Sequence, residues 1–582
     1  MMPFVGNMSL IDAGRALLSL PQALLYPPPQ TTSAPLVTVR NGTYSGVYNS
    51  QYDQDYFLGV PFAQPPVRFS IAQGLNTTWD GIRKAHEYPV HCYGYGWDQD
   101  GFEQSEDCLY LNIVRPAGLH NHGLPVAAWI HGGGLWMGGA ADPRYNLSFI
   151  VEQSVALGKP VIGVSLNYRL SAFGFLMGKE AIKEGVANLG FRDQRLALSW
   201  INENIAAFGG DPNKVTIFGE SSGAESVAAQ VFAFNDDGLF RGAIGESGFG
   251  APLGRYPGGF NATERPQGTY DSFVRSVPSC KKLAGSDSTL DCLRRVPSEE
   301  IDLALRSSGG QSWAPVLDGD FFADYTTNQL ASGRFLKIPI LIGANTDEGT
   351  SFGFRRVDDD DDLRAGIKVM MIPYGVEKTT GKIRDGLVDE LLERYPNNQS
   401  IGIPSLETWP HVIQPGDGYA EEFGLQYRRD NAIFGDYVMQ YQRRRANKAW
   451  AKHSVPSYVY RFNIRPNGQP PEAGVAFVFH NTNGDGYEPN PFGGNGTYPA
   501  DAKAMSKTIS TAWINFINDL DPNGDSGPEL FNGNKWPTYE LSGGPNGKGV
   551  VFNINGTHIE VDDWRAGGME WMAEHALTVF GN

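Results

Sequence analysis

The sequence lacks any apolar run as long as a transmembrane helix, which needs about 18 residues or more. Positive charge is also scarce, because Lys+Arg number 47 against 64 Asp+Glu, which gives a net charge of −17. An acidic surface repels phosphate backbones, so we expect no nucleic-acid partner and no membrane-spanning segment. Hydrophobic residues still make up 41% of the 582 residues, which allows a large core and excludes a disordered or fibrous chain.

Cysteine is scarce as well. The four cysteines fall into two near-neighbour pairs, Cys92 with Cys108 and Cys280 with Cys292, and this spacing excludes a CxxC metal site. They are either four reduced, buried thiols or two disulfides formed in an oxidising compartment, and we favour the disulfides. Eight Asn-X-Ser/Thr sequons also favour a secreted protein. They begin at Asn7, Asn41, Asn76, Asn146, Asn261, Asn398, Asn495 and Asn555.

The N-terminal segment has no periodic apolar pattern. Residues 16–26 have the length of a signal-peptide core, but Pro21 and Gln22 interrupt it, so the secretion signal is weak. We predict that residues 1–35 are a leader or a disordered N-terminus. Residues 36–582 contain no internal repeat and no Pro/Ser-rich linker, so we predict that they form one domain.

Short apolar runs alternate with helical stretches in this region. The runs are Leu124–Ile130, Pro160–Leu166, Val215–Phe218 and Ile338–Ile342. Continuous apolar runs are typical of strands buried on both faces of a parallel sheet. Asp193–Phe208 repeats apolar residues at helical spacing and ends at two glycines, which predicts a helix. The alternation predicts an α/β fold, with a mostly parallel central sheet flanked by helices and long loop insertions.

Two glycine-rich motifs follow predicted strands. Gly219-Glu220-Ser221-Ser222-Gly223 comes directly after Val215–Phe218 and before a helical stretch. This is the context of a nucleophile elbow, in which a strained serine exposes its hydroxyl above the sheet. His131-Gly132-Gly133-Gly134 comes directly after Leu124–Ile130, and its backbone N–H groups can stabilise an oxyanion together with the N–H of Ser222.

These motifs resemble the type-B carboxylesterase/lipase family, the α/β-hydrolases that include the cholinesterases, and above all its secreted fungal branch. Three further stretches support the resemblance over residues 36–582: Asp55–Ala63, Ser105–Asn112 and Asn188–Gln194. The resemblance implies an α/β-hydrolase fold and hydrolysis of a small-molecule ester, without a metal or an organic cofactor.

The resemblance also implies roles for particular residues. Ser221 is the nucleophile, and the N–H groups of Gly133, Gly134 and Ser222 form the oxyanion hole. Glu348, in the segment Gly343–Thr350 after the strand Ile338–Ile342, is the carboxylate that orients the base. Glu220 and Ser247 occupy supporting polar positions. The implied disulfides are Cys92–Cys108 and Cys280–Cys292.

The family histidine is missing from its expected position. The family pattern runs roughly Gly-Val-x-His-x-x-Glu-Val-x-Phe-Val-Phe. An ungapped alignment on Phe477–Phe479 puts Pro471 at the histidine, and a gapped one that starts at Gly474 also removes it. A serine hydroxyl needs an adjacent base, and His480 is the histidine in this part of the sequence. We therefore predict His480 as the base.

Three hypotheses remain. The protein is an ester hydrolase whose base is His480 or another group, or it is a functional hydrolase whose sequence is given incorrectly in this region, for instance through a wrong splice prediction. Alternatively, it is a repurposed protein that binds a ligand or partner, or runs a different reaction, in the former acyl pocket. The intact serine, oxyanion and Glu348 motifs argue against long decay. We predict a carboxylic ester hydrolase that acts through a serine acyl-enzyme, with an esterase-like binding protein as the alternative. The sequence carries no signal for an oligomeric state or an acyl length.

Overall fold

The computed structural model describes residues 34–119, 122–233, 237–250, 264–286, 288–370, 381–464, 474–525, 531 and 533–581. The predicted leader lies almost wholly outside the described residues. So do Pro471 and the sequons at Asn7 and Asn261.

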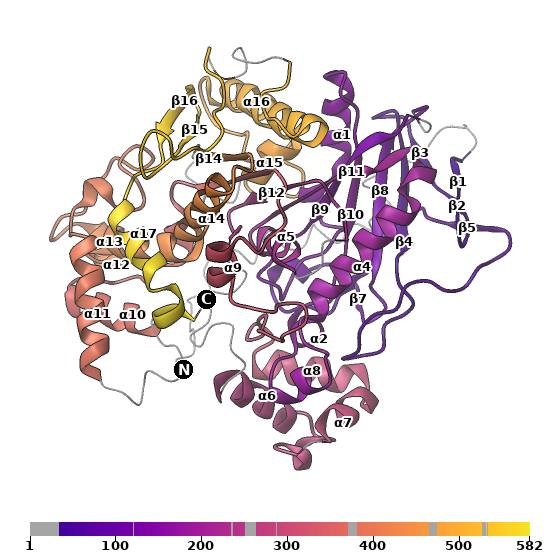
Figure 1. The fold of residues 1–582 in the computed structure, drawn as a ribbon, viewed down its shortest axis with the longest axis horizontal. Coiled ribbons are helices and arrows are strands. Elements are labelled where there is room, and N and C mark those ends of the chain that lie inside the picture. The colour runs from indigo at the N-terminus through magenta and orange to yellow at the C-terminus, as the bar shows by residue number, and fades with distance from the viewer. Residues whose placement is uncertain are drawn as a thin grey trace.

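An eleven-stranded sheet runs through the molecule (Figure 1). From edge to edge its strands are β16 (Gly556–Val561), β15 (Lys548–Asn553), β14 (Ser457–Asn463), β13 (Ile340–Asn345), β12 (Gly242–Glu246), β11 (Gly210–Glu220), β9 (Leu124–Ile130), β10 (Ile162–Leu166), β8 (Tyr110–Pro116), β4 (Gln54–Pro61) and β3 (Val47–Asn49). The strands from β15 to β10 run parallel, and antiparallel strands complete both edges. The predicted α/β fold with a mostly parallel central sheet is confirmed.

Two small sheets lie beside the central one. The first contains β1 (Leu36–Val39), β2 (Gly42–Ser45) and β5 (Ile82–Lys84), and the second pairs β6 (His91–Cys92) with β7 (Gln104–Ser105).

The apolar runs form strands because both faces of the central sheet are covered. Along β9, Ile130 packs into one core cluster and its neighbour Trp129 into the other, and neither residue is exposed to solvent. Successive side chains of a strand point to opposite faces, so a strand between two cores is apolar throughout. β9 has the predicted bounds, and the predicted helix is α4 (Leu189–Asn204) followed by the 3₁₀ turn Ile205–Phe208.

Helices cover the two faces of the sheet. The core that contains Trp129 includes residues of α1 (Leu147–Ala156), α15 (Gly474–Phe479) and α16 (Tyr498–Asp519). The core that contains Ile130 includes residues of α4, α5 (Ser222–Phe232) and α14 (Tyr441–Lys452). A further core cluster packs residues 569–580 near the C-terminus against residues of the segment 357–441, which lies far from them in the sequence.

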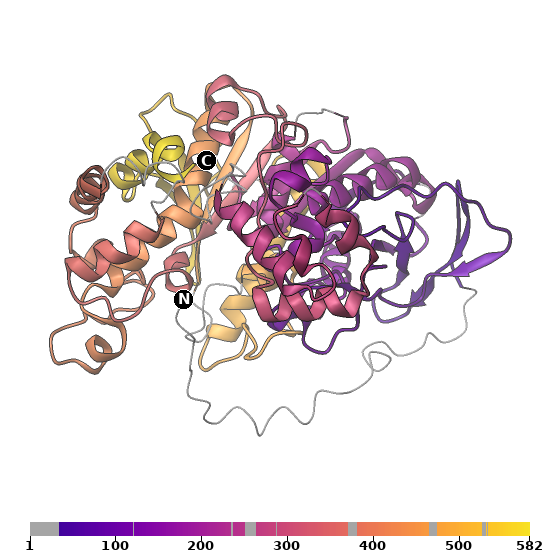
Figure 2. The same cartoon turned by 90° about the horizontal axis from the view of Figure 1, so that it is seen from below.

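Among the other helices, those between residues 264 and 308 gather in one group and those between residues 360 and 435 in another, which α17 (Ala566–Glu574) joins (Figures 1 and 2). In chain order, these other helices are α2 (Ser171–Phe175), α3 (Lys179–Lys183), α6 (Glu264–Ser276), α7 (Thr289–Arg295), α8 (Ser298–Ser308), α9 (Thr326–Ser332), α10 (Asp360–Met370), α11 (Gly381–Arg394), α12 (Gly418–Phe423), α13 (Tyr427–Gly435) and α17.

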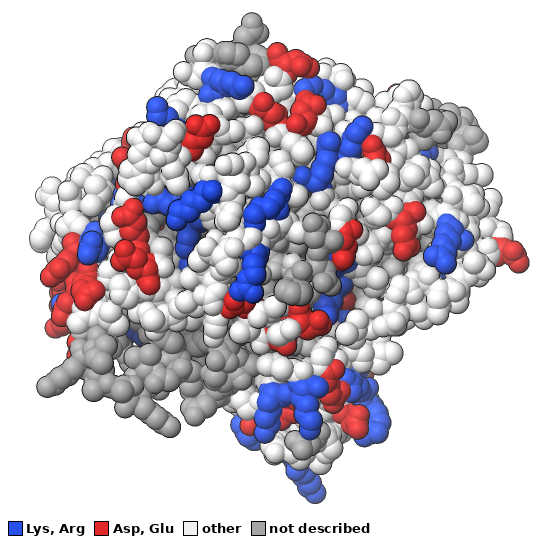
Figure 3. Space-filling view, viewed as in Figure 1, with Lys and Arg blue, Asp and Glu red and all other residues white. Residues whose placement is uncertain are grey.

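The surface carries charges of both signs. Figure 3 shows acidic and basic side chains interspersed over one face rather than gathered in one acidic patch. Within the described ranges, no helix has the combined length and apolarity that crossing a membrane requires.

The four cysteines form two disulfides, Cys92–Cys108 and Cys280–Cys292. This confirms the predicted pairing, and no cysteine is left free.

Burial separates the described sequons into two groups. Asn41 and Asn146 are each only 8% exposed. The amide of Asn41 donates to the carbonyl of Thr77, and the side chain of Asn146 caps α1. Asn76, Asn398, Asn495 and Asn555 are exposed. Among the described sequons, a glycan fits only on these four exposed asparagines. The eight sequons found in the sequence therefore overstate the number of usable glycosylation sites.

We expect glycans on the four exposed asparagines when the chain passes through a secretory pathway. Peptide mapping after enzymatic deglycosylation in ¹⁸O water should mark these four and leave Asn41 and Asn146 unmarked, because a glycan would displace their buried side chains. A marked Asn41 or Asn146 in the folded protein would contradict this expectation.

Candidate active site

Ser221 lies at the sharp turn between β11 and α5. Its backbone has φ 55° and ψ −125°, a strained conformation for a residue with a side chain. The turn is held because the Ser221 N–H donates to the carbonyl of Glu246 on the neighbouring strand, at 2.9 Å. Ser221 is only partly buried, so its side chain lies at a solvent-accessible bend above the sheet.

Glycines permit this turn because backbone segments pass very close to one another. A methyl group at Gly223 would lie 2.2 Å from the carbonyl oxygen of Ile130, and one at Gly219 would lie 2.6 Å from the same oxygen. Both distances are shorter than any side-chain contact allows. The two glycines of the motif therefore allow α5 to begin directly against the end of β9.

The loop after β9 lies beside this turn. Gly133, Gly134 and Leu135 have φ values of 97°, 67° and 69°, so the backbone reverses within three residues. The Leu135 N–H donates to the hydroxyl of Ser222 at 3.1 Å, which ties the loop to the residue after Ser221. The predicted oxyanion residues Gly133, Gly134 and Ser222 thus belong to two segments that are in direct contact.

His131, the first residue of this loop, holds the loop in place. Nδ1 of His131 donates to the carbonyl of Gly132 at 2.9 Å, and its ring stacks on Tyr168 with centroids 4.5 Å apart. Burial lowers the pKa of His131 to about 3, so the ring stays neutral.

Glu348 follows β13 and is 5% exposed. Its Oε1 accepts hydrogen bonds from the backbone N–H of Asn345 at 2.7 Å and from the Asn345 side chain at 3.0 Å. The same Asn345 amide donates to the hydroxyl of Ser247 at 3.3 Å. Asn345 therefore connects Glu348 to Ser247, a role that the sequence analysis missed.

The neighbouring Asp347 has a different environment. Its carboxylate accepts from the backbone N–H of Ser405 at 2.7 Å and from the hydroxyl of Thr408, so it anchors a distant loop.

β11 and β12 end in the same tripeptide. Gly219-Glu220-Ser221 and Gly245-Glu246-Ser247 are in register across the two parallel strands. Ser247 also has a positive φ of 53°, and its N–H donates to the carbonyl of Gly343 on the next strand at 2.9 Å. The sequence analysis named Glu220 and Ser247 but missed Glu246, although the repeated tripeptide was a visible signal.

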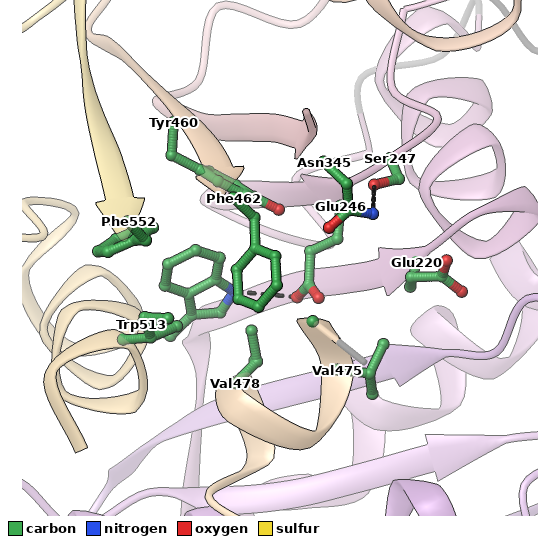
Figure 4. Close-up of a pocket in the computed structure, with 12 residues that line it drawn as sticks. Glu220, Glu246, Ser247, Asn345, Tyr460, Phe462, Val475, Val478, Trp513 and Phe552 are labelled. Atoms are coloured by element: carbon green, nitrogen blue, oxygen red, sulfur yellow. Dashed lines mark hydrogen bonds between the residues drawn. The ribbon is translucent and has the colours of Figure 1, made fainter. Parts of the chain in front are cut away.

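A small pocket lies beside these strand ends (Figure 4). Glu220, Glu246, Ser247 and Asn345 line its polar side, and Trp513 and Gly474 contribute to the rest of the wall. The pocket has a volume of about 20 Å³, which is room for a water molecule.

Glu246 is the buried acid of this pocket. Oε1 accepts a hydrogen bond from the indole Nε1 of Trp513 at 2.9 Å, and the residue is 3% exposed. Burial raises the pKa of Glu246 from 4.5 to about 8, and the Trp513 hydrogen bond opposes this only in part. Glu246 therefore holds its proton at neutral pH.

His480 directly follows α15, whose Gly474, Val475 and Val478 line this pocket, but His480 is not itself among the lining residues. Nδ1 of His480 makes a hydrogen bond with the hydroxyl of Ser506 on α16 at 3.0 Å. Burial, and then the charge of Lys507, lower the pKa of His480. Its role as the base stays a prediction.

A mostly parallel sheet, a strained serine between a strand and a helix, and a glycine loop against that helix define an α/β-hydrolase. Comparison with known proteins gives the family. Residues 33–559 match the model of the carboxylesterase family, and the chain belongs to this family. It is a carboxylic ester hydrolase.

Individual relatives agree with this family. The chain is 33% identical to "Secreted lipase 1" of Botryotinia fuckeliana, over 88% of each chain. It is 31% identical to "Lipase 4" of Diutina rugosa, over 94% of this chain and 97% of the relative. The solved structure of Aspergillus niger EstA shares the fold with a TM-score of 0.75 at 24% identity, over 94% of this chain and 99% of that one. These similarities give no support to a repurposed binding protein.

Replacing Gly223 should disable the turn. We expect Gly223→Ala to lower stability by about 1–3 kcal/mol or to shift α5, because the new methyl group meets the Ile130 carbonyl. Ester hydrolysis should fall at least about 10-fold, since Ser221 moves with α5. Thermal unfolding and p-nitrophenyl ester assays measure both effects.

Gly567→Ala is the matched control, because it lies in α17 and an added methyl group there meets nothing within 4 Å. It should keep full activity. Equal behaviour of the two variants would contradict the role given to Gly223.

Glu246 should make stability depend on pH. Between about pH 4.5 and 8 the folded state binds a proton at Glu246 that the unfolded state releases, so stability falls as pH rises through this window. Relative to Glu246→Gln, the wild type should lose up to about 1.4 kcal/mol per pH unit. Urea unfolding at pH 5, 6, 7 and 8 measures the difference, with the exposed Glu203→Gln as control. Parallel profiles for wild type and Glu246→Gln would refute the assignment.

Proposed function

We propose that the chain hydrolyses carboxylic esters through an acyl-enzyme formed on Ser221. The strained, solvent-accessible turn of Ser221 carries this proposal, because it holds one hydroxyl above the carboxyl ends of the parallel strands. The adjoining loop supports it, since Gly133 and Gly134 lie in the backbone reversal that Ser222 ties to the elbow.

The reaction has two halves. The Ser221 hydroxyl attacks the ester carbonyl, and the N–H groups of Gly133, Gly134 and Ser222 stabilise the negative oxygen of the tetrahedral intermediate. The alcohol leaves, and water then releases the acid from Ser221. Glu348 orients and stabilises the proton acceptor, and Glu220 and Ser247 support the site from the neighbouring strand ends.

We also propose the setting in which the enzyme works. The relatives include proteins named secreted lipases, the cysteines are paired, and four sequons are exposed, which together favour a secreted glycoprotein acting on acyl esters. We propose that residues 36–582 form one domain, supported by a single sheet whose strands span residues 47–561.

Covalent labelling tests the nucleophile directly. A fluorophosphonate probe reacts with an activated serine, so the wild type should be labelled and should hydrolyse p-nitrophenyl butyrate, whereas Ser221→Ala should do neither. Hydrolysis by Ser221→Ala should fall by about 10³-fold or more.

Ser247→Ala is the matched control for labelling. Ser247 shares the preceding residues and the positive φ of Ser221, but it makes a buried hydrogen bond with Asn345. Its variant should still take up the probe. Labelling that survives in Ser221→Ala, or a folded wild type without hydrolysis, would overturn the proposed mechanism.

A further inference from the structure

The segment that carries Glu348 is pressed against α13. Glu348 begins the 3₁₀ turn Glu348–Ser351, which follows β13. A methyl group on Gly349 would lie 1.8 Å from the carbonyl oxygen of Asn431 on α13, and one on Gly435 would lie 2.7 Å from the Gly349 nitrogen. Backbone segments this close leave no room between them, so the position of Glu348 depends on how α13 holds the turn.

The chain leaves this turn at Phe354. The N–H groups of Phe352 and Gly353 both donate to the carbonyl of Gly349, at 3.0 and 2.8 Å. The next N–H, that of Phe354, donates instead to Oδ2 of Asp430 on α13, at 2.5 Å. A methyl group on Gly353 would lie 2.6 Å from the same oxygen, so no side chain fits between the turn and this carboxyl group. One side chain of α13 therefore holds the backbone where the turn ends.

Asp430 is fully buried. Its exposed fraction is 0%, and within the part of the chain that the structure describes its Oδ1 has no hydrogen-bond partner. Burial raises the pKa of Asp430 to about 7, and the Phe354 N–H opposes this only in part. A buried carboxyl group with one unpaired oxygen is costly for folding. The benefit of this acid therefore has to come from the contact that Oδ2 makes.

α13 is fixed by contacts of its own. The Arg428 guanidinium donates to the carbonyls of Trp409 and His411, at 2.7 Å each. Arg429 makes an ion pair with Asp360 of α10 at 2.8 Å. These contacts do not involve the turn, so α13 can act as a support for it.

Two anchors thus hold the chain around Glu348. Before it, the carboxylate of Asp347 anchors a distant loop. After it, the Phe354 N–H is held by Asp430. Loss of the second anchor lets the turn shift, and the Glu348 carboxylate shifts with it.

We propose that Asp430 is a positioning residue for Glu348: it holds the end of the turn that Glu348 begins, and so sets where the Glu348 carboxylate points. The inference rests on the proposed function, in which Glu348 orients the proton acceptor of Ser221. Asp430 acts through the backbone rather than on the reacting atoms.

Two replacements of similar size separate the hydrogen bond from the packing. Asp430→Asn keeps an oxygen that accepts the Phe354 N–H, whereas Asp430→Leu fills the space without an acceptor. Asp430→Leu should lower kcat for p-nitrophenyl butyrate about 10- to 100-fold, because a small misplacement of a catalytic group is costly, with KM within about threefold of the wild type. Asp430→Asn should bring kcat back to within about threefold of the wild type, because the hydrogen bond is restored.

Thermal unfolding checks that each variant is folded, and Asp430→Ala takes the place of Asp430→Leu if the latter does not fold. Asp211→Leu is the control. Asp211 also accepts a backbone N–H, that of Asn213 at 2.9 Å, but it lies at the other end of β11 from Ser221. This variant should leave kcat unchanged.

A double-mutant cycle tests whether Asp430 acts through Glu348. Glu348→Gln alone should lower kcat at least about 10²-fold. If Asp430 serves to place Glu348, Asp430→Leu should cost less than about threefold in the Glu348→Gln background. A purely structural role predicts the same loss in both backgrounds.

The outcomes separate this inference from the proposed function. A folded wild type that neither hydrolyses the ester nor takes up the fluorophosphonate probe would overturn the Ser221 mechanism itself. A fully active Glu348→Gln would overturn the role of Glu348 and this inference with it. With Glu348→Gln impaired, an unchanged kcat in Asp430→Leu, an equally impaired Asp430→Asn or additive losses in the cycle would overturn only the role of Asp430.

Discussion

The close approach of three backbone segments at the ends of β9 and β11 is the constraint on which the site depends. The Ile130 carbonyl lies so near Gly219 and Gly223 that neither position accepts even a methyl group. This packing forces the chain to turn within one residue, and Ser221 therefore adopts a strained positive φ. It also brings Ser222 to the Leu135 N–H, so the serine and the oxyanion loop are positioned by the same contact.

The parallel arrangement of the strands gathers the remaining polar groups. Parallel strands present their carboxyl ends at one edge, so Ser221, Ser247 and Asn345, which end three successive strands in space, become neighbours. Each serine N–H is satisfied by a carbonyl of the next strand. The Asn345 side chain then connects Ser247 to Glu348, so these three side chains form one hydrogen-bonded network.

The register-paired Glu220 and Glu246 lie in different surroundings. Glu246 is enclosed by the core that contains Trp513 and remains protonated, whereas Glu220 faces the oxyanion loop. The low polarity around Glu246 disfavours its charged form.

The sequence by itself determined the α/β class, the bounds of β9, the disulfide pairing and the elbow at Ser221, because buried strands, near-neighbour cysteines and glycine turns are encoded locally. It also pointed to Glu348 through the segment after β13. Only the tertiary structure decided which sequons are buried, since the burial of Asn41 depends on carbonyls 34 and 36 residues away. The same holds for Glu246, which packs against an indole 267 residues distant, and for His480, whose ring partner is on α16. Strand register and core packing bring such residues together, and no local pattern records them.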